Sequence, residues 1–147
     1  MPIDPLQPDL AMSLTLDPYA PRAARYHVAQ VDRPSPDLRD AVVLLTSELV
    51  TRAVQHAHAS GANMELRAWM PTDVVRVELR APRQHLELSA EDNGRDYSLL
   101  LLDELADRWS VDEAGQDACM WFEIDRHLHM AAHVEPQGRR EKSLASP

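Results

Sequence analysis

Two charged residues one helical turn apart are the first candidates for chemistry in this chain. Glu48 and Arg52 fall at positions i and i+4 of a segment rich in apolar residues, and this spacing places both side chains on one face of a helix. The acid stands on the N-terminal side, which is the favourable order for an ion pair. We therefore expect Glu48 and Arg52 to bond to each other.

Histidines and a single cysteine are the other reactive side chains. His129 and His133 can share a helix face, with His127 just before them, but no Cys or acidic residue stands at a spacing that would complete a zinc site. We expect these histidines to be structural and no metal to bind. No activating partner for the Cys119 thiol is visible in the sequence, so we expect a small core residue.

The segment that carries Glu48 and Arg52 has the pattern of a long buried helix. Ser35 is a good N-cap, Pro36 suits the first helical position, and Gly61 is a natural stop after about residue 59. Apolar residues recur at helical spacing, namely Leu38, Val42, Val43, Leu45, Leu49, Val50 and Val54. A helix that is apolar over so much of its surface packs against something broad, such as a sheet.

Alternating apolar and polar residues predict strands before and after that helix. The predicted strands are 12–16, 63–70, 74–81, 110–112 and 119–125, with turns at 71–73 and at Gly115. Further helices are predicted at about 21–30 and 98–109, and the polar segment 82–97 predicts a lid or binding loop. This pattern favours an α+β fold: a two-layer sandwich with helices on one face of a mixed, mostly antiparallel sheet.

Length and composition bound the kind of protein. The 147 residues fit one domain, which we expect at 12–134, between a flexible arm at 1–11 and a flexible tail at 135–147. A net charge of −9 without a strongly basic stretch disfavours direct nucleic-acid binding. The apolar runs are too short to cross a bilayer, no secretory signal is visible, and one cysteine suits a reducing compartment. We expect a cytoplasmic protein that contacts neither nucleic acid nor membrane.

Three separated motifs resemble one protein superfamily in their order and spacing. They are Glu48-Leu49-Val50-Thr51-Arg52-Ala53-Val54-Gln55-His56, Leu105-Ala106-Asp107-Arg108-Trp109 and Trp121-Phe122-Glu123. Together they resemble the anti-sigma-factor serine kinases of the GHKL superfamily, over roughly Leu14 to Asp125. The resemblance implies the Bergerat fold, in which ATP lies between the second helix and a mobile lid.

The resemblance also implies which positions would form the nucleotide site. Glu48 matches the catalytic Glu, and Gly94 matches the first glycine of the lid. The remaining positions carry replacements: Arg52 for the magnesium-binding Asn, Ala81 for the Asp that recognises adenine, Arg83 for a glycine, Asp96 for the second lid glycine, and Cys119 for a late Thr, with Ala118 where a Lys often precedes it. A guanidinium offers a metal ion only donors and positive charge. We expect a former ATP pocket that holds no cofactor and no metal.

A damaged nucleotide site in an intact framework predicts a regulatory role rather than catalysis. We expect a non-catalytic, pseudokinase-like module that acts on transcription through protein–protein contacts. Its partner would be a sigma factor, an anti-sigma antagonist or another transcriptional regulator, and a homodimer would fit the same family. Two alternatives stay open: an ATP-dependent serine kinase in which Arg52 contacts a phosphate directly, and a small-molecule sensor.

The three tryptophans divide into two expected roles. Trp109 and Trp121 are expected to anchor the core. Trp69 falls on the strand face opposite Met64 and Leu66, so we expect it to form a surface contact.

Overall fold

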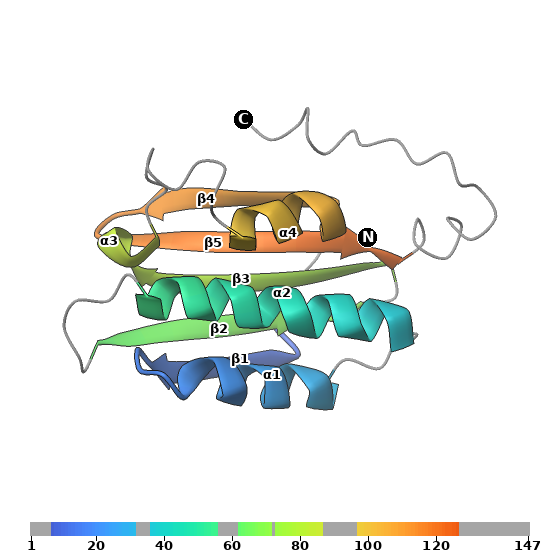
Figure 1. Cartoon of the computed structure of the whole chain (residues 1–147), viewed down its shortest axis with the longest axis horizontal. Coiled ribbons are helices and arrows are strands. Elements are labelled where there is room, and N and C mark those ends of the chain that lie inside the picture. Colours follow the sequence, from blue (N-terminus) through green and yellow to red (C-terminus); the bar gives the residue numbers. More distant parts are fainter. Residues whose placement is uncertain (1–6, 32–35, 56–61, 72, 87–96, 127–147) are drawn as a thin grey trace.

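The computed structural model describes residues 7–31, 36–55, 62–71, 73–86 and 97–126, which form an α+β fold (Figure 1). Its strands are β1 (Leu10–Thr15), β2 (Asn63–Trp69), β3 (Val74–Pro82), β4 (Arg108–Ala114) and β5 (Asp117–Asp125). Its helices are α1 (Ala20–Val31), α2 (Pro36–Gln55), α3 (Arg83–Leu86) and α4 (Tyr97–Leu105). No helix in these ranges is long and apolar enough to cross a membrane.

The strands form one open sheet in the order β1-β2-β3-β5-β4. Every neighbouring pair is antiparallel, so the mixed sheet predicted from the sequence is wrong for the described strands. β3 and β4 run in the same direction, but the β4–β5 hairpin places β5 between them. β1, β3 and β4 therefore run in one direction and β2 and β5 in the other, and no two strands of the same direction are neighbours.

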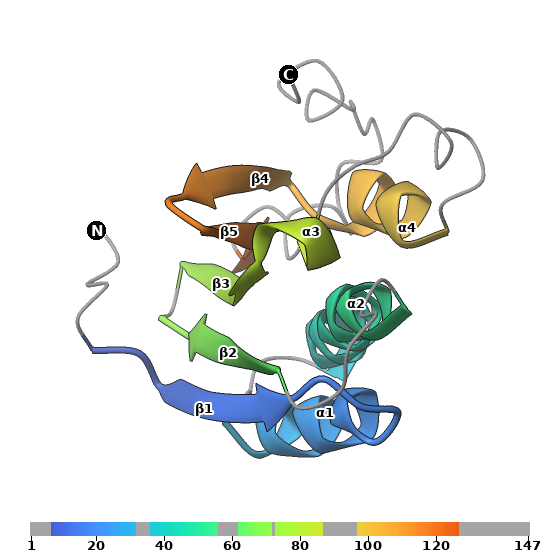
Figure 2. The same ribbon diagram turned by 90° about the vertical axis from the view of Figure 1, so that its left-hand side faces the viewer.

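Helices α1, α2 and α4 lie side by side on one face of the sheet (Figure 2). We call them the helix layer, and the opposite side of the sheet the open face, which carries no helix in the described parts of the chain. The predicted apolar stripe of α2 is buried against the sheet at Leu38, Val42, Leu45 and Leu49. This two-layer arrangement with helices on one face was predicted from the sequence.

The pairing register of β3 with β5 decides which side chains meet the helix layer. Val75, Val77, Leu79 and Ala81 of β3 alternate with polar residues and are buried, as are Ala118, Met120, Phe122 and Ile124 of β5. The residues between them point to the open face, because successive side chains of a strand alternate. A shift of one residue would exchange the two sets, so the apolar face fixes the register.

Several element boundaries differ from the predictions. β1 begins at Leu10 rather than at residue 12, because Asp9 N already donates to Ala68 O (2.8 Å) and ties the chain to β2. α4 ends at Leu105, and Trp109 belongs to β4 instead of the helix. Asp107 N donates to Glu123 O (2.8 Å), so the chain has already joined the sheet two residues after the helix.

The tryptophan predictions are largely wrong. Trp69 does lie on the face opposite Met64 and Leu66, but only 3% of it is exposed, so it offers no surface contact. Trp121 lies half-buried on the open face rather than in the core. Trp109 packs partly buried against the core, and its indole Nε1 donates to Asp103 Oδ1 at 2.9 Å.

Candidate functional site

The flank of α2 that faces α4 carries the two residues singled out first. Glu48 is half-buried there, and Arg52, one turn further along, is 2% exposed and among the largest fully buried side chains. Arg52 is therefore buried more completely than Glu48. A guanidinium keeps its charge even when buried. The site therefore holds a permanent positive charge.

Glu48 bonds to α4 rather than to Arg52. The Ser98 hydroxyl, in the first turn of α4, donates to Glu48 Oε1 at 3.1 Å, and it also lies 3.5 Å from the Glu48 carbonyl oxygen. Ser98 itself is buried. The predicted ion pair between Glu48 and Arg52 is not among the contacts of these two described residues, so that prediction is wrong. The carboxylate instead attaches α4 to α2.

Two of the positions that the resemblance assigns to the adenine end of the site carry alanine. Ala81 of β3 and Ala118 of β5 are direct partners across the sheet, and both are buried on the side of the helix layer. Neither side chain can accept or donate a hydrogen bond. Neither position could therefore supply a polar contact to a purine.

Cys119 lies on the other side of the sheet. It is half-buried on the open face, between Arg80 and Asp112 in the register, so the prediction of a core residue is wrong. Burial is the largest cause that raises the pKa of its thiol, to about 11, and the charge of Glu78 adds to the effect. The thiol is therefore protonated near neutral pH and is a poor nucleophile. Its neighbour Ala118, not Cys119, faces the helix layer.

The remaining predicted pocket positions do not join this group. Arg83 is exposed at the start of α3, and its guanidinium lies 3.5 Å from Glu113 Oε2 of β4, with exposed fractions of 45% and 73% for the two side chains. Gly94 and Asp96 lie outside the described residues, as do His127, His129 and His133. Within the described ranges, no cluster of three His, Cys, Asp or Glu residues could hold a metal ion.

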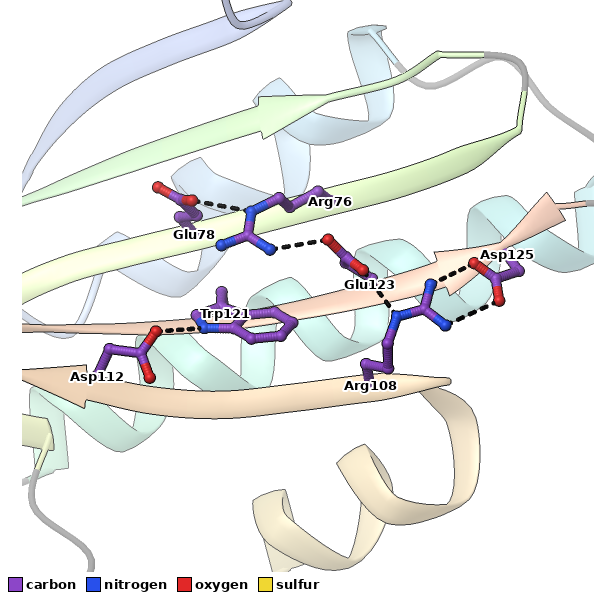
Figure 3. Close-up of polar contacts among 7 residues, drawn as sticks. All are labelled: Arg76, Glu78, Arg108, Asp112, Trp121, Glu123 and Asp125. Atoms are coloured by element: carbon purple, nitrogen blue, oxygen red, sulfur yellow. Dashed lines mark hydrogen bonds and ion pairs between the residues drawn. The ribbon is translucent and has the colours of Figure 1, made fainter. Parts of the chain in front are cut away.

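A second polar cluster spans three strands of the open face (Figure 3). Glu123 of β5 accepts from Arg76 Nη1 of β3 and from Arg108 Nε of β4, both at 2.8 Å. Arg76 Nε also donates to Glu78 Oε2 at 2.9 Å. Arg108 makes a two-pronged contact with Asp125, one arm of which measures 3.0 Å. Glu123 is therefore the acceptor that joins both arginines.

The pKa shifts of the two arginines follow from these contacts. Hydrogen bonding to Asp125 is the largest cause that raises the pKa of Arg108, against some desolvation. Desolvation lowers the pKa of Arg76, but its hydrogen bonds to Glu123 and Glu78 outweigh this effect and raise the pKa overall. Both guanidinium groups are held charged and in place, so the cluster, which we call the open-face network, binds β3, β5 and β4 together.

Trp121 completes the open-face network. The Arg76 guanidinium carbon lies 4.2 Å from the centre of its ring, a cation–π distance. Its indole Nε1 donates to Asp112 Oδ2 at 2.9 Å, and Ser110 Oγ donates to the other oxygen of Asp112 at 3.1 Å. These groups satisfy one another, so the network stabilises the sheet.

Sequence reasoning missed Ser98 and the open-face network for different reasons. Ser98 lies 50 residues from Glu48, and no local pattern connects them. The open-face network could have been predicted from the sequence. Alternation along β5 places Cys119, Trp121, Glu123 and Asp125 on one face, opposite the apolar residues.

Comparison with known proteins does not identify a family for this chain. No protein-family model matches this chain, and no curated protein matches it either. The assignment to a family therefore rests on the motifs and the site, and it stays a proposal.

Proposed function

We propose that this protein is a non-catalytic regulatory module of the GHKL superfamily, related to the anti-sigma-factor serine kinases, that binds another protein instead of Mg-ATP. Its partner would be a sigma factor, an anti-sigma antagonist or another transcriptional regulator, met in the cytoplasm. The observation that carries the proposal is the buried guanidinium of Arg52, one turn from Glu48.

The chemistry of Arg52 argues against a bound magnesium ion. Mg²⁺ demands oxygen ligands in near-octahedral geometry, and a guanidinium supplies only donors and a positive charge. Arg52 therefore supplies no ligand for the ion at the position where the resemblance implies an asparagine. Phosphoryl transfer depends on that metal to neutralise the developing charge and to position the phosphates, so the reaction loses its main electrostatic support.

Ala81 and Ala118 would weaken recognition of adenine. Ala81, at the position where the resemblance implies an aspartate, supplies no side-chain acceptor for the purine amino group. A donor left unpaired on burial costs about 1–3 kcal/mol, which corresponds to roughly a tenfold to hundredfold loss of affinity. The proposal therefore expects both metal recognition and base recognition to be impaired.

One observation favours the alternative of an ATP-dependent serine kinase with an atypical site. Glu48 keeps its carboxylate within hydrogen-bond distance of a hydroxyl, that of Ser98 at 3.1 Å, as a general base must. Arg52 would then contact a phosphate directly, since arginine binds phosphates in a two-pronged manner. The same bond also explains Glu48 as a tether for α4, which is the role we propose.

Thermal unfolding with ATP, with and without magnesium, separates the two functions. A ligand at a hundred times its Kd stabilises a protein by about 2.7 kcal/mol, or roughly 10 °C for a domain of this size. We predict a change in Tm below about 1 °C at millimolar ATP in either condition, because the site binds too weakly to contribute. A magnesium-dependent rise of several degrees would overturn the proposal.

A matched pair of variants tests for residual catalysis. Glu48→Gln removes the candidate base, and Glu104→Gln makes the same change at an exposed position of α4. We predict that wild type and both variants show the same background rate of ATP hydrolysis. Hydrolysis that Glu48→Gln abolishes and Glu104→Gln leaves intact would support the kinase instead.

A further inference from the structure

Helix α4 is more apolar than its place at the surface of the molecule requires. Six of its nine residues are leucine or tyrosine. Only Ser98 and Leu102 of this helix are buried, whereas Tyr97 and Leu100 are 63% and 53% exposed. A helix that is apolar around most of its circumference is normally enclosed by protein. α4 therefore has an apolar side that nothing in the described parts of the chain covers.

The exposed apolar side chains of α4 lie together on one side of the helix. Tyr97 and Leu100 are three positions apart, and the half-buried Leu101 is four positions from Tyr97, so the three are neighbours on the helix surface. Glu104, four positions from Leu100, is exposed beside them. We call these four residues the α4 surface. It combines an apolar patch with a negative charge.

The charge on α4 favours a basic partner. Asp103 and Glu104 lie in its last turn, and the helix has no basic residue. The C-terminal end of a helix is also the negative end of its dipole, where cations are favoured. The chain as a whole carries a net charge of −9, so it attracts basic partners at long range and repels acidic ones, including other copies of itself.

The arrangement of the helices favours a partner that is itself helical. α2 and α4 lie side by side on the sheet (Figure 2). Leu44 of α2, one turn before Glu48 on the flank that faces α4, is also exposed, at 38%. Exposed apolar side chains on two neighbouring helices offer the kind of surface that an amphipathic helix covers with its own apolar stripe. The nine residues of α4 extend over about 13.5 Å, so a few turns of a partner helix would span them.

We propose that the α4 surface binds a basic amphipathic helix of a partner protein. The apolar stripe of that helix packs on Tyr97 and Leu100, and its lysines or arginines lie beside Asp103 and Glu104. The inference rests on the proposed function for the existence of a protein partner. It adds the surface that the partner contacts and the chemistry that the partner must have.

A synthetic helical peptide tests the α4 surface with the full chain. The probe has about 18 residues, long enough to form a helix, with leucines three and four positions apart and lysine or alanine elsewhere. Fluorescence anisotropy of the labelled peptide should show saturable binding with a Kd below about 100 μM, weaker as the salt concentration rises. The same peptide with glutamate in place of each lysine should not bind. No binding of the lysine peptide, or equal binding of the two peptides, would overturn the inference.

Matched substitutions of exposed tyrosines locate the binding on α4. Tyr97→Ser and Leu100→Ser each remove apolar area from the α4 surface and should raise the Kd of the lysine peptide by about threefold to tenfold. Tyr26 of α1 is 61% exposed, close to the 63% of Tyr97, so Tyr26→Ser is the control and should leave the Kd unchanged. Equal Kd values for Tyr97→Ser and Tyr26→Ser would rule out docking on α4.

Charge reversal separates a local contact from the effect of net charge. Glu104→Lys should raise the Kd of the lysine peptide by about threefold to tenfold at low salt. Glu113→Lys changes the net charge by the same amount at a side chain of β4 that is 73% exposed, and it should change the Kd less than about twofold. An equal loss of affinity in both variants would assign the binding to net charge alone and refute docking on α4.

Failure here is distinct from failure of the proposed function. A chain that binds neither Mg-ATP nor the lysine peptide would overturn only the docking surface, and a chain that binds both would overturn only the proposed function. Sedimentation equilibrium of the chain without peptide tests for another occupant: a dimer that Leu100→Ser dissociates would give the α4 surface to a second copy and overturn the inference. Circular dichroism of each variant confirms that the fold is intact before its Kd is compared.

Discussion

Removing the Ser98 hydroxyl is the perturbation that most directly tests the contact between α2 and α4. Ser98 is buried, and its hydroxyl donates to Glu48 Oε1 at 3.1 Å. Hydrogen bonds to charged groups contribute about 1.5–3 kcal/mol, but Glu48 is only half-buried, so water can replace part of the lost bond. We expect Ser98→Ala to lower the free energy of unfolding by about 1 kcal/mol and Tm by about 3–6 °C.

The β4 strand provides a matched control for that variant. Ser110 Oγ donates to Asp112 Oδ1 at 3.1 Å, also from a serine to a carboxylate, but Asp112 is exposed. Ser110→Ala should therefore lower the free energy of unfolding by less than about 0.5 kcal/mol. Urea unfolding followed by circular dichroism measures both variants under the same conditions.

A double-mutant cycle locates the effect in the bond itself. Combined with Glu48→Gln, Ser98→Ala should show a coupling energy of about 0.5–1 kcal/mol, because the two side chains are in direct contact. Ser98→Ala with the same stability as Ser110→Ala, or strict additivity with Glu48→Gln, would refute the view that Glu48 attaches α4 to α2.

Three further predictions follow from the open face and the last hairpin. Because burial raises the pKa of the Cys119 thiol from its ordinary 9.0 to about 11, its alkylation by iodoacetamide near pH 8 should be about a hundredfold slower than that of an unperturbed thiol. The stability this thiol contributes is complete below pH 9 and is lost as pH rises from 9 to 11; a Cys119→Ser variant that loses stability identically over that range would contradict this. Glu123→Gln weakens contacts to two arginines and should lower the free energy of unfolding by about 1–2 kcal/mol after allowance for solvent screening. The control Glu113→Gln should lower it by less than about 0.5 kcal/mol. Equal urea midpoints for the two variants would argue against the open-face network. Gly115 has φ +69° with open space around its missing Cβ, so Gly115→Ala should cost about 1 kcal/mol through the backbone alone, and an unchanged Tm would speak against that turn.

The elements whose residues repeat with a clear period were predictable from the sequence. α2 begins at Pro36 as predicted, because a proline suits the first helical turn, and its leucine and valine stripe is buried as expected. The hairpin turn at Gly115 is also confirmed. Local preference and burial agree in these segments, so a single sequence is enough to define them.

The errors arose where distant contacts decide the outcome. The pattern placed Trp69 on the correct face of β2, but which groups cover a face depends on the rest of the fold. The end of α4 was misplaced because Asp107 joins β5 through Glu123, a contact over 16 residues of sequence. The partner of Glu48 was missed for the same reason, since helical spacing favoured Arg52 and only the packing of α4 on α2 brings Ser98 close.

We propose that Arg52, Ala81 and Ala118 prevent binding of Mg-ATP. Isothermal titration calorimetry of the full chain with Mg-ATP measures this binding directly, without reference to any substrate or partner. We predict no saturable heat up to millimolar nucleotide. Saturable binding of one Mg-ATP per chain with a micromolar Kd, lost when magnesium is removed, would contradict the proposal. It would favour the alternative of an ATP-dependent kinase.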